Sequence, residues 1–312
     1  MKNKELMIGI PTKNHPKYMQ YYLAKTLVAA KKYGIDICIY DSSDDDSTKR
    51  IVENRIKKGY DNLFYYHFDP SIPPEVKMKR VLVESDYDYV WLCGDGIVLD
   101  IEKTISVIEK EIQKKRDVIV FSFFDTYGPY NEYTDPLEMI IPTWNPCSLW
   151  GGVIYKGDLF TEKEWDDLFG VYTENIHFVG LFDFFSTHKM NAVAIKTEFF
   201  KDNPFKQEAV WVLNGRILEA ETDFIPKAAD DLPPMFDSVK PKVRRLFADN
   251  GDTFTMKKSW YLRRYNNLNL EKVFKYRKKI KSITDTKWIW FLFVSLVPKK
   301  LALKLSSLFS ES

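Results

Sequence analysis

The sequence predicts an α/β fold with a mostly parallel central sheet, helices on both faces of that sheet, and a basic helical region at the C-terminus. Short apolar runs alternate with amphipathic segments through the first 123 residues, which is typical of a parallel sheet with crossover helices. Hydrophobic residues make up 45% of the 312 residues, which is enough for one large domain and an appendage. The third observation is the charge, which is divided unevenly along the chain.

Five apolar runs in the first part of the chain predict strands, and four segments between them predict helices. Apolar residues at helical spacing define the first helix, and Gly34 is a suitable stop for it. Ser47 or Thr48 can cap the second helix. The strands are expected at 6–10, 35–40, 63–68, 89–93 and 118–123, and the helices at 18–33, 49–58, 75–85 and 102–115.

The pattern is less regular after residue 124. Residues 125–145 are rich in Pro, Tyr, Asn and Asp and predict loops, and four prolines in 226–241 favour a linker or an exposed loop. Further elements are expected as strands at 150–155 and 192–195 and as helices at 161–168, at 178–189 and from 256 onward. We therefore divide the chain into a first half of the main domain at 1–125, a second half at 126–254 and a basic helical region at 255–312.

The net charge of +2 hides an acidic body and a basic C-terminal region. Residues 255–312 hold 14 of the 46 Lys and Arg residues but only 3 of the 44 Asp and Glu residues, so their net charge is +11 against −9 for the rest. This division predicts that the C-terminal region meets an anionic surface, and it does not favour nucleic acid as a partner of the body.

The apolar run 288–297 lies within this basic region and is ended by Pro298. Ten residues form about 15 Å of helix, which is too short for a bilayer core of about 30 Å. We expect a monotopic anchor that lies in the inner face of the membrane. The alternative is a helix that packs on the body or on a second subunit of a homo-oligomer.

The three cysteines, Cys38, Cys93 and Cys147, are widely spaced, which predicts neither a disulfide framework nor a zinc motif. Buried reduced thiols fit a cytoplasmic protein. Together with the basic region, they lead us to expect a cytoplasmic protein that is peripheral on the inner face of the cell membrane.

Residues 89–100 place an acidic side chain at the end of a predicted buried strand. The apolar run stops at Cys93 and is followed by Gly94-Asp95-Gly96. The carboxyl ends of parallel strands are where such sheets bind ligands, and glycines let a phosphate approach the backbone closely. Asp95 can supply one oxygen ligand to a cation, whereas Ile97 can supply none.

Three segments, 8–19 (IGIPTKNHPKYM), 37–48 (ICIYDSSDDDST) and 88–96 (DYVWLCGDG), together resemble the inverting glycosyltransferases of family 2, which have the GT-A fold. The segment 8–19, IGIPTKNHPKYM, is similar to the opening strand and Pro-Thr-x-Asn loop of that family. The segment 37–48, ICIYDSSDDDST, matches the second strand and its loop, with Asp41, Asp46 and Thr48 at the pattern positions. The segment 88–96, DYVWLCGDG, takes the place of the strand that ends in the metal-binding aspartates.

The resemblance implies a nucleotide-sugar donor, most simply a UDP-sugar, bound at the ends of these strands. The residues expected to bind it are Pro11, Thr12, Asn14, Asp41, Ser43, Lys79 and Asp95. Lys77 and Arg80 lie on the same predicted helix as Lys79, and helix phase alone does not choose among the three. The cation implied is Mn²⁺ or Mg²⁺, held by Asp95 with the donor diphosphate; His188 is a further candidate ligand. Because the second aspartate is missing, we expect weak metal affinity in the absence of nucleotide.

An inverting transfer needs one general base for the acceptor hydroxyl. The candidate is Asp183, a lone carboxylate in an apolar stretch, with Asp166 and Asp167 as alternatives; local capping or pairing would also explain Asp183. The segment 148–160 resembles the acceptor side of the family, so Trp150, Gly151 and Gly152 are expected to contact the acceptor. A core position would equally explain Trp150.

These inferences predict an enzyme that transfers a single sugar to a lipid-linked or cell-surface glycan acceptor in polysaccharide biosynthesis. No Gln-x-x-Arg-Trp segment is present, which argues against a processive synthase. The missing second aspartate supports one alternative, a catalytically degenerate GT-A domain that acts as a scaffold or binding subunit of a glycan-assembly complex. A nucleotidyltransferase is disfavoured because the loop 10–16 is a poor phosphate cradle.

Overall fold

The computed structural model describes residues 5–122, 129–171, 175–206, 215–248, 254–264 and 266–310. The chain forms two compact units, 1–206 and 207–312. The boundary predicted from the sequence for the last region lies later, at 254/255. Each unit is described by itself below.

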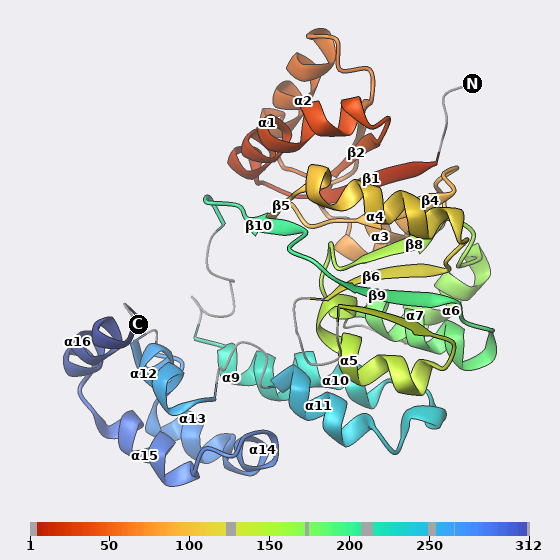
Figure 1. Cartoon of the computed structure of the whole chain (residues 1–312). Coiled ribbons are helices and arrows are strands. Elements are labelled where there is room, and N and C mark those ends of the chain that lie inside the picture. The colour runs from red at the N-terminus through yellow and green to blue at the C-terminus, as the bar shows by residue number, and fades with distance from the viewer. Residues whose placement is uncertain are drawn as a thin grey trace. The chain divides into compact units, whose positions relative to one another are not determined.

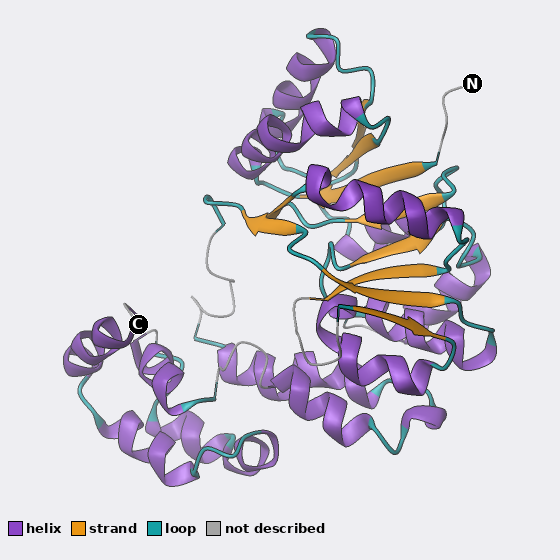
Figure 2. Cartoon of the chain, in the orientation of Figure 1, coloured by secondary structure: helices purple, strands orange, loops and turns teal. Residues whose placement is uncertain are grey.

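The first unit is built on an eight-stranded sheet with the order β3-β2-β1-β4-β8-β6-β9-β7. Six strands run in the same direction, and β7 and β8 run antiparallel to their neighbours. Figures 1 and 2 show the strands stacked through the unit with helices on either side. The strands are β1 (Leu6–Thr12), β2 (Asp36–Asp41), β3 (Leu63–His67), β4 (Tyr89–Leu92), β6 (Val118–Ser122), β7 (Tyr130–Tyr133), β8 (Val153–Lys156) and β9 (Ala192–Lys196). The expected mostly parallel sheet is confirmed.

Alternation along β1 explains why helices cover both faces. Ile8 and Ile10 point into a core shared with Met19 and Tyr22 of α1. Gly9 points the other way, toward Val81 of α3, and a Cβ atom at Gly9 would clash with that valine. The first helices are α1 (Pro16–Lys32), α2 (Ser47–Lys57), α3 (Pro74–Leu82) and α4 (Ile101–Gln113).

The prediction of loops over 125–145 is wrong for the residues described there. β7 lies at Tyr130–Tyr133, and α5 runs over Pro136–Ser148 despite two internal prolines. Asp135 starts the helix, because its Oδ1 accepts a hydrogen bond of 2.8 Å from the Leu137 amide and Pro136 occupies the first position. α5 packs against β6 and against α7 (Ile176–Thr187). Packing therefore outweighs the poor helix propensity; residues 123–128 lie outside the described part.

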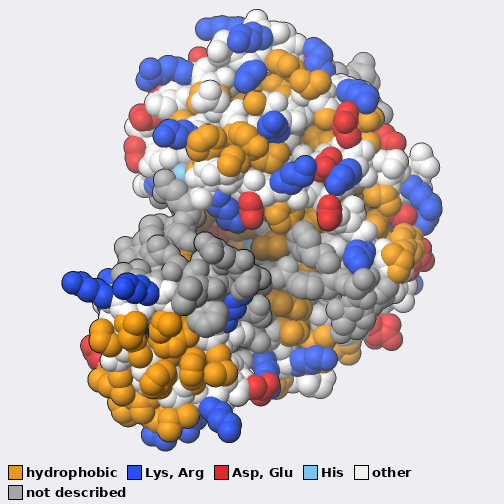
Figure 3. Space-filling view, turned by 60° about the vertical axis from the view of Figure 1, so that its left-hand side comes forward, with side chains coloured by type: hydrophobic (Ala, Val, Ile, Leu, Met, Phe, Trp, Pro, Cys, Tyr) orange, Lys and Arg blue, Asp and Glu red, His pale blue; other side chains and the backbone are white. Residues whose placement is uncertain are grey.

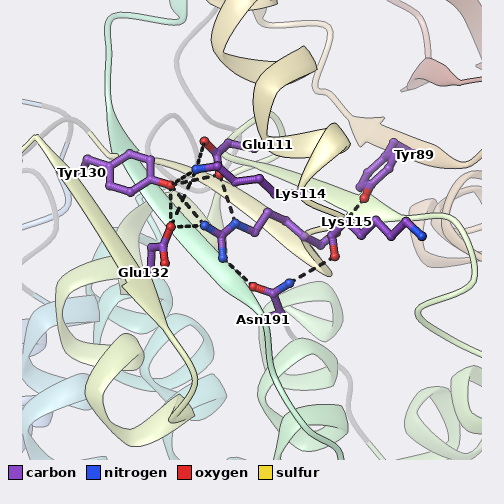
Figure 4. A network of polar contacts seen from close by, with 8 residues as sticks. Tyr89, Glu111, Lys114, Lys115, Tyr130, Glu132 and Asn191 are labelled. Atoms are coloured by element: carbon purple, nitrogen blue, oxygen red, sulfur yellow. Dashed lines mark hydrogen bonds and ion pairs between the residues drawn. The ribbon is translucent and has the colours of Figure 1, made fainter.

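A partly buried ionic network, centred on Glu111 and Arg116, holds β7 to the rest of the sheet (Figure 4). The Arg116 guanidinium donates to Glu111 at 3.0 Å and to Asn191 at 2.5 Å, and it also pairs with Glu132. Tyr130 donates to Glu111 at 3.1 Å. Burial acts to raise the pKa of Glu111, but hydrogen bonds from Lys114, Arg116 and Tyr130 outweigh it and hold that pKa below its ordinary value. The network thus fixes the antiparallel edge of the sheet.

Two short strands that were not predicted from the sequence form a separate antiparallel pair. β5 (Ile97–Leu99) follows the Gly94–Gly96 turn and pairs with β10 (Phe200–Asp202). Three residues are too few for a recognisable alternation of apolar and polar residues, so neither strand can be predicted from the sequence. The remaining helix of the first unit is α6 (Glu162–Val171).

The second unit is helical. Its elements are α9 (Ile217–Glu219), the π-helix η2 (Ala220–Phe224), α10 (Ile225–Asp230), the 3₁₀-helix η3 (Pro234–Phe236), α11 (Lys240–Ala248), α12 (Met256–Arg264), α13 (Leu270–Lys275), α14 (Arg277–Ile283), α15 (Trp288–Leu296) and α16 (Lys299–Ser310). The prediction of a linker at 226–241 is wrong, because that segment holds most of α10, all of η3 and the start of α11. Ala228, Ala229 and Phe236 of this segment are buried.

Residues Phe254, Leu262, Ile280, Phe291 and Val294 form part of a core in this unit. The expected helices after 256 are confirmed. Among the described helices, none is long and apolar enough to cross a membrane.

Candidate functional site

The carboxyl ends of β1, β2 and β4 lie side by side, because these strands are parallel neighbours. Thr12 ends β1 opposite Asp41, which ends β2. The turn that carries Asp95 follows β4. Three of the residues predicted from the sequence therefore meet at one edge of the sheet, where parallel sheets bind ligands.

Asp95 is held by two side chains from the β1–α1 segment. Its Oδ2 accepts a hydrogen bond of 2.6 Å from the Thr12 hydroxyl and lies 2.9 Å from Nδ1 of His15. The hydrogen bond with Asp95 raises the pKa of His15. His15 is not among the site residues predicted from the sequence, although its place in the loop after Pro11 was a usable signal.

The Asp95 turn is also fixed from β10. Asn203 is buried, and its side-chain amide donates to the Asp95 carbonyl at 3.2 Å and to the Tyr18 carbonyl at 3.1 Å. The Asn203 backbone N–H donates to the Gly96 carbonyl at 3.0 Å. Asn203 lies more than 100 residues after Asp95, and no sequence pattern linked the two.

Asp41 is fully buried and belongs to a polar cluster. Its Oδ1 accepts hydrogen bonds from the Ser43 amide at 2.9 Å and the Ser43 hydroxyl at 2.5 Å. Its Oδ2 accepts from the Tyr65 hydroxyl at 2.8 Å. The Ser43 hydroxyl in turn accepts a hydrogen bond of 2.8 Å from the Asn14 backbone N–H. The loops after β1 and β2 are therefore linked through Ser43 and the Asp41 side chain.

Asn14 makes a second link between the same two loops. It has a left-handed backbone with φ of 57°, which asparagine tolerates better than most residues. Its side-chain amide donates to an Asp44 carboxylate oxygen at 2.6 Å and accepts from the Asp44 amide at 2.9 Å. Asn14 and Ser43 thus join the two loops that follow Thr12 and Asp41.

Lys77 is buried beneath this edge of the sheet. Its Nζ donates at 2.7 Å both to the Thr12 carbonyl and to the Ser42 hydroxyl. Burial lowers the pKa of Lys77 to about 8, although Asp41 and Asp95 act in the opposite direction. Lys79, the predicted nucleotide ligand, contacts Asp166 at 2.7 Å and Glu162 at 3.3 Å instead of these strand ends.

The predicted acceptor residues lie directly against the Asp95 turn. The Gly94 amide donates to the Trp150 carbonyl at 3.3 Å, and the Trp91 indole donates to the Gly151 carbonyl at 2.7 Å. Gly151 has φ of 119°, and a Cβ atom there would clash with Ile97. Ile97, which can supply no metal ligand, therefore packs against Gly151. Gly152 lies so close to the Pro146 carbonyl that it also has no room for a side chain.

His177, near the start of α7, packs beside Trp150, one of the predicted acceptor residues. Its ring lies edge-on to Trp150 with 6.3 Å between centroids, and its Nε2 lies 3.0 Å from the Ser148 carbonyl. Burial lowers the pKa of His177 to about 4, so the ring is neutral at pH 7. Its Nδ1 is buried and has no hydrogen-bond partner among the described residues.

Asp183 and His188 lie at the other end of α7. They line a pocket of about 260 Å³ together with Glu164 and Asp167. His188 stacks on Phe184, its Nδ1 lies 2.9 Å from the Phe184 carbonyl, and its Nε2 lies 3.8 Å from Glu164. Asp183 follows His177 by six positions, which corresponds to a rise of about 9 Å along a helix. Asp183 therefore lies in the C-terminal half of α7, not at its start.

The protein side chains at the Asp95 edge could hold a divalent cation only if a bound substrate supplied further oxygen atoms. Within the described ranges, no group of three or more His, Cys, Asp or Glu side chains could hold a metal ion. Asp95 offers one carboxylate beside the His15 imidazole. Because Mg²⁺ is commonly held by one or two carboxylates together with substrate phosphates, this donor set suits a cation that arrives with a diphosphate.

The whole chain is similar in structure to S. aureus TarS. TarS 1–349 matches with a TM-score of 0.51 at 13% identity, covering 93% of this chain and 90% of that one. Its complex with UDP-GlcNAc matches with a TM-score of 0.50 at 13% identity, covering 98% and 92%. A longer TarS structure matches with a TM-score of 0.51 at 15% identity; the match covers 99% of this chain and 53% of that chain. This chain thus spans about half the length of the longer TarS structure.

The fold is GT-A. At this level of identity the similarity establishes the fold alone. No family model and no curated protein sequence matches the chain.

Proposed function

We propose that the protein is a glycosyltransferase that moves a single sugar from a UDP-sugar to a glycan acceptor, by a metal-assisted single displacement with inversion. The observation that carries the proposal is the convergence of Thr12, Asp41 and Asp95 at the ends of β1, β2 and β4. A TarS structure of the same fold holds UDP-GlcNAc. A lipid-linked or cell-surface glycan precursor is the proposed acceptor.

In this proposal the linked loops after β1 and β2 form the uridine site. The Pro11 and Thr12 backbone and the Asp41 carboxylate would contact the base and ribose, since a carboxylate can accept hydrogen bonds from uracil N3–H or a ribose hydroxyl. Asn14 and Ser43 would hold the two loops at the right separation. Lys77 supports Thr12 from below and adds positive charge near both carboxylates.

Asp95 is the proposed protein ligand for Mn²⁺ or Mg²⁺, with the donor diphosphate supplying other ligands. When bound, the ion would neutralise charge on the diphosphate as it leaves. Thr12, His15 and Asn203 orient the Asp95 turn for this role. His188 contacts Phe184 and Glu164 in the structure. To act as the proposed metal ligand, its side chain would have to move toward the Asp95 edge.

Asp183 is proposed as the general base that takes the proton from the acceptor hydroxyl. It lines the same pocket as Asp167, which provides a matched control carboxylate. Asp183→Asn should reduce sugar transfer strongly and leave UDP affinity nearly unchanged, whereas Asp167→Asn should change neither. Loss of UDP binding in Asp183→Asn would assign that residue a structural role, and undiminished transfer would exclude it as the base.

The experiment that tests the activity itself is a screen of UDP-, GDP- and TDP-sugars with Mn²⁺. We expect one UDP-sugar to bind, as measured by calorimetry, and to be hydrolysed slowly. If none of these donors binds or reacts, the proposed activity is wrong.

The packing role of Ile97 favours one second candidate, a GT-A domain that no longer catalyses transfer and acts as a scaffold or binding subunit in glycan assembly. Binding of a UDP-sugar without hydrolysis or transfer in the same screen would support this candidate over the enzyme.

A further inference from the structure

One face of α15 is apolar and exposed in the folded second unit. Ile289, Phe293 and Leu296 are 67%, 52% and 61% exposed. They are spaced four and three residues apart, so they lie on one side of the helix. The helix itself contains no charged residue.

The opposite face of α15 is already used for packing. Phe291 and Val294 are buried in the core of the unit, where Phe291 lies edge-on to Phe254 with 6.3 Å between ring centroids. The Trp290 indole donates to the Ser259 hydroxyl of α12 at 2.8 Å. Because the helix is fixed on its inner side, the exposure of its outer side is a property of the folded unit.

Neighbouring helices extend the apolar surface. Met256 of α12 and Leu301 of α16 are also exposed. A groove of about 730 Å³ lies along α15, lined by Met256, Asp285, Thr286, Lys287, Ile289, Trp290 and Phe293. Figure 3 shows a broad hydrophobic patch on this unit with Lys and Arg side chains at its margin. We call Met256, Ile289, Phe293, Leu296 and Leu301 the α15 patch.

The charges that border the α15 patch are mainly positive. Lys287 precedes α15, and Lys299 and Lys300 follow it; all three are exposed. Asp285, the acidic residue of the groove, pairs with Arg245. The residues 255–312 that carry the patch have a net charge of +11.

We propose that the α15 patch docks the protein on an anionic lipid bilayer, with α15 lying in the plane of the interface. A patch without polar groups at its centre and with lysines around it matches the acyl chains and the anionic headgroups of such a surface. The apolar ring of Trp290 lines the groove beside the patch, while its N–H donates within the unit. α15 has nine residues and is about 14 Å long, so it can enter one leaflet only.

The charges argue against a second copy of the chain as the occupant. In a symmetric dimer the same patch faces itself, so the lysines around one patch would face the lysines around the other. Like charges brought together at an interface disfavour association. An anionic leaflet reverses this effect, with each basic residue near it strengthening binding about fivefold. The proposal is independent of the proposed reaction, because vesicle binding requires no turnover.

The test is sedimentation of the full chain with vesicles of phosphatidylcholine, alone or mixed with phosphatidylserine. The chain should bind the mixed vesicles, and high salt should weaken that binding. The triple variant Ile289→Ser, Phe293→Ser, Leu296→Ser should lose roughly tenfold or more in vesicle binding, since it removes the apolar surface that enters the leaflet. Because all three side chains are exposed, its circular dichroism and melting temperature should match those of the parent protein.

Matched controls come from the first unit. Val28 and Ile56 are exposed apolar residues there, and Val28→Ser with Ile56→Ser should leave vesicle binding unchanged. The pair Lys299→Gln, Lys300→Gln should weaken binding, whereas Lys57→Gln, Lys58→Gln removes the same charge from α2 and should not.

Three results would overturn the proposal. The chain could fail to bind mixed vesicles, or the triple variant could bind them as well as the parent. The third is a concentration-dependent dimer in analytical ultracentrifugation that the triple variant abolishes, which would assign the patch to self-association.

Discussion

Nδ1 of His15 lies 2.9 Å from Oδ2 of Asp95, the same oxygen that accepts the Thr12 hydroxyl hydrogen bond. The contact joins the loop after β1 to the turn after β4. Thr12 lies opposite Asp41 in the sheet, so the contact brings Asp95 into a single polar group with the proposed uridine site. The first prediction concerns this carboxylate.

Asp95→Asn should abolish metal-dependent sugar transfer while the protein stays folded. The amide carbonyl can still accept the Thr12 hydrogen bond, but a neutral side chain is a poor ligand for a hard divalent cation. A metal contributes several kcal/mol to the stabilisation of charge in the transition state, so transfer should fall by roughly 100-fold or more. The measurement is transfer rate against Mn²⁺ concentration. Asp158→Asn, an exposed carboxylate of the same unit, is the control. Near-normal activity of Asp95→Asn, or full activity of the parent in chelator, would remove Asp95 from the metal site.

Asp41→Ala should weaken UDP binding by about 1–3 kcal/mol, the cost of leaving a buried polar partner unpaired. It should also lower stability, because the Ser43 and Tyr65 hydrogen bonds are lost. Tyr65→Phe separates the two effects, since it removes one hydrogen bond and keeps the carboxylate. If Asp41 contacts the nucleotide, calorimetry will show a much larger loss of UDP affinity in Asp41→Ala than in Tyr65→Phe. Equal affinities for all three proteins would exclude the contact.

Lys77→Met and Lys79→Met should differ although they lie two residues apart. Lys77 is buried and holds Thr12 and Ser42 together, so its loss should lower the free energy of unfolding by about 1–3 kcal/mol and weaken UDP binding. Lys79 pairs with Asp166 and Glu162 near the surface, where ion pairs contribute little, so its loss should leave stability nearly unchanged and UDP affinity intact. Urea unfolding and calorimetry on both variants check this. A larger loss of UDP affinity in Lys79→Met would restore Lys79 as the nucleotide ligand that the sequence suggested.

The sequence predicted the parallel half of the sheet well because its strands are apolar runs with clear stops, as in the predicted strands 6–10 and 35–40. It allowed Asp41 and Asp95 to be assigned to the same edge of the sheet, because parallel strands end at one edge. It could not predict Asn203 or choose Lys77 from the three basic residues of its helix, since both roles depend on hydrogen bonds formed across the fold. It also failed at α5, where Asp135 and packing against β6 sustain a helix in a segment whose proline content indicates loops.

Gly151→Ala should destabilise the first unit by about 1–3 kcal/mol. The residue has φ of 119°, which strains any side chain, and its Cβ would clash with Ile97 Cδ1. Ile97→Val removes that single atom, so the double variant should recover the steric part of the loss but not the strain. A double-mutant cycle from urea unfolding measures the coupling. Simple additivity of the two changes would show that Ile97 does not oppose a side chain at Gly151.

The last prediction concerns Glu221, a buried carboxylate of the second unit. Its Oε2 has no hydrogen-bond partner within the described part of the chain, and burial raises the pKa of Glu221 to about 8. The folded state therefore binds a proton more tightly than the unfolded state, where the carboxyl has its ordinary pKa near 4.5. Between those two values the folded state holds more protons, so this residue makes the protein less stable as pH rises from about 4.5 to about 8.

Glu221→Gln should remove this pH dependence, because glutamine stays neutral. The variant should be more stable than the parent by about 1–3 kcal/mol near pH 8, with the gain shrinking toward pH 5. Thermal and urea unfolding across that range measure the difference. Glu219→Gln is the matched control from the preceding turn: the hydrogen bond with Arg216 lowers the pKa of Glu219, so its removal should not stabilise the protein at any of these pH values. Parallel stability curves for Glu221→Gln and the parent would mean that Glu221 is ionised and satisfied in the folded protein.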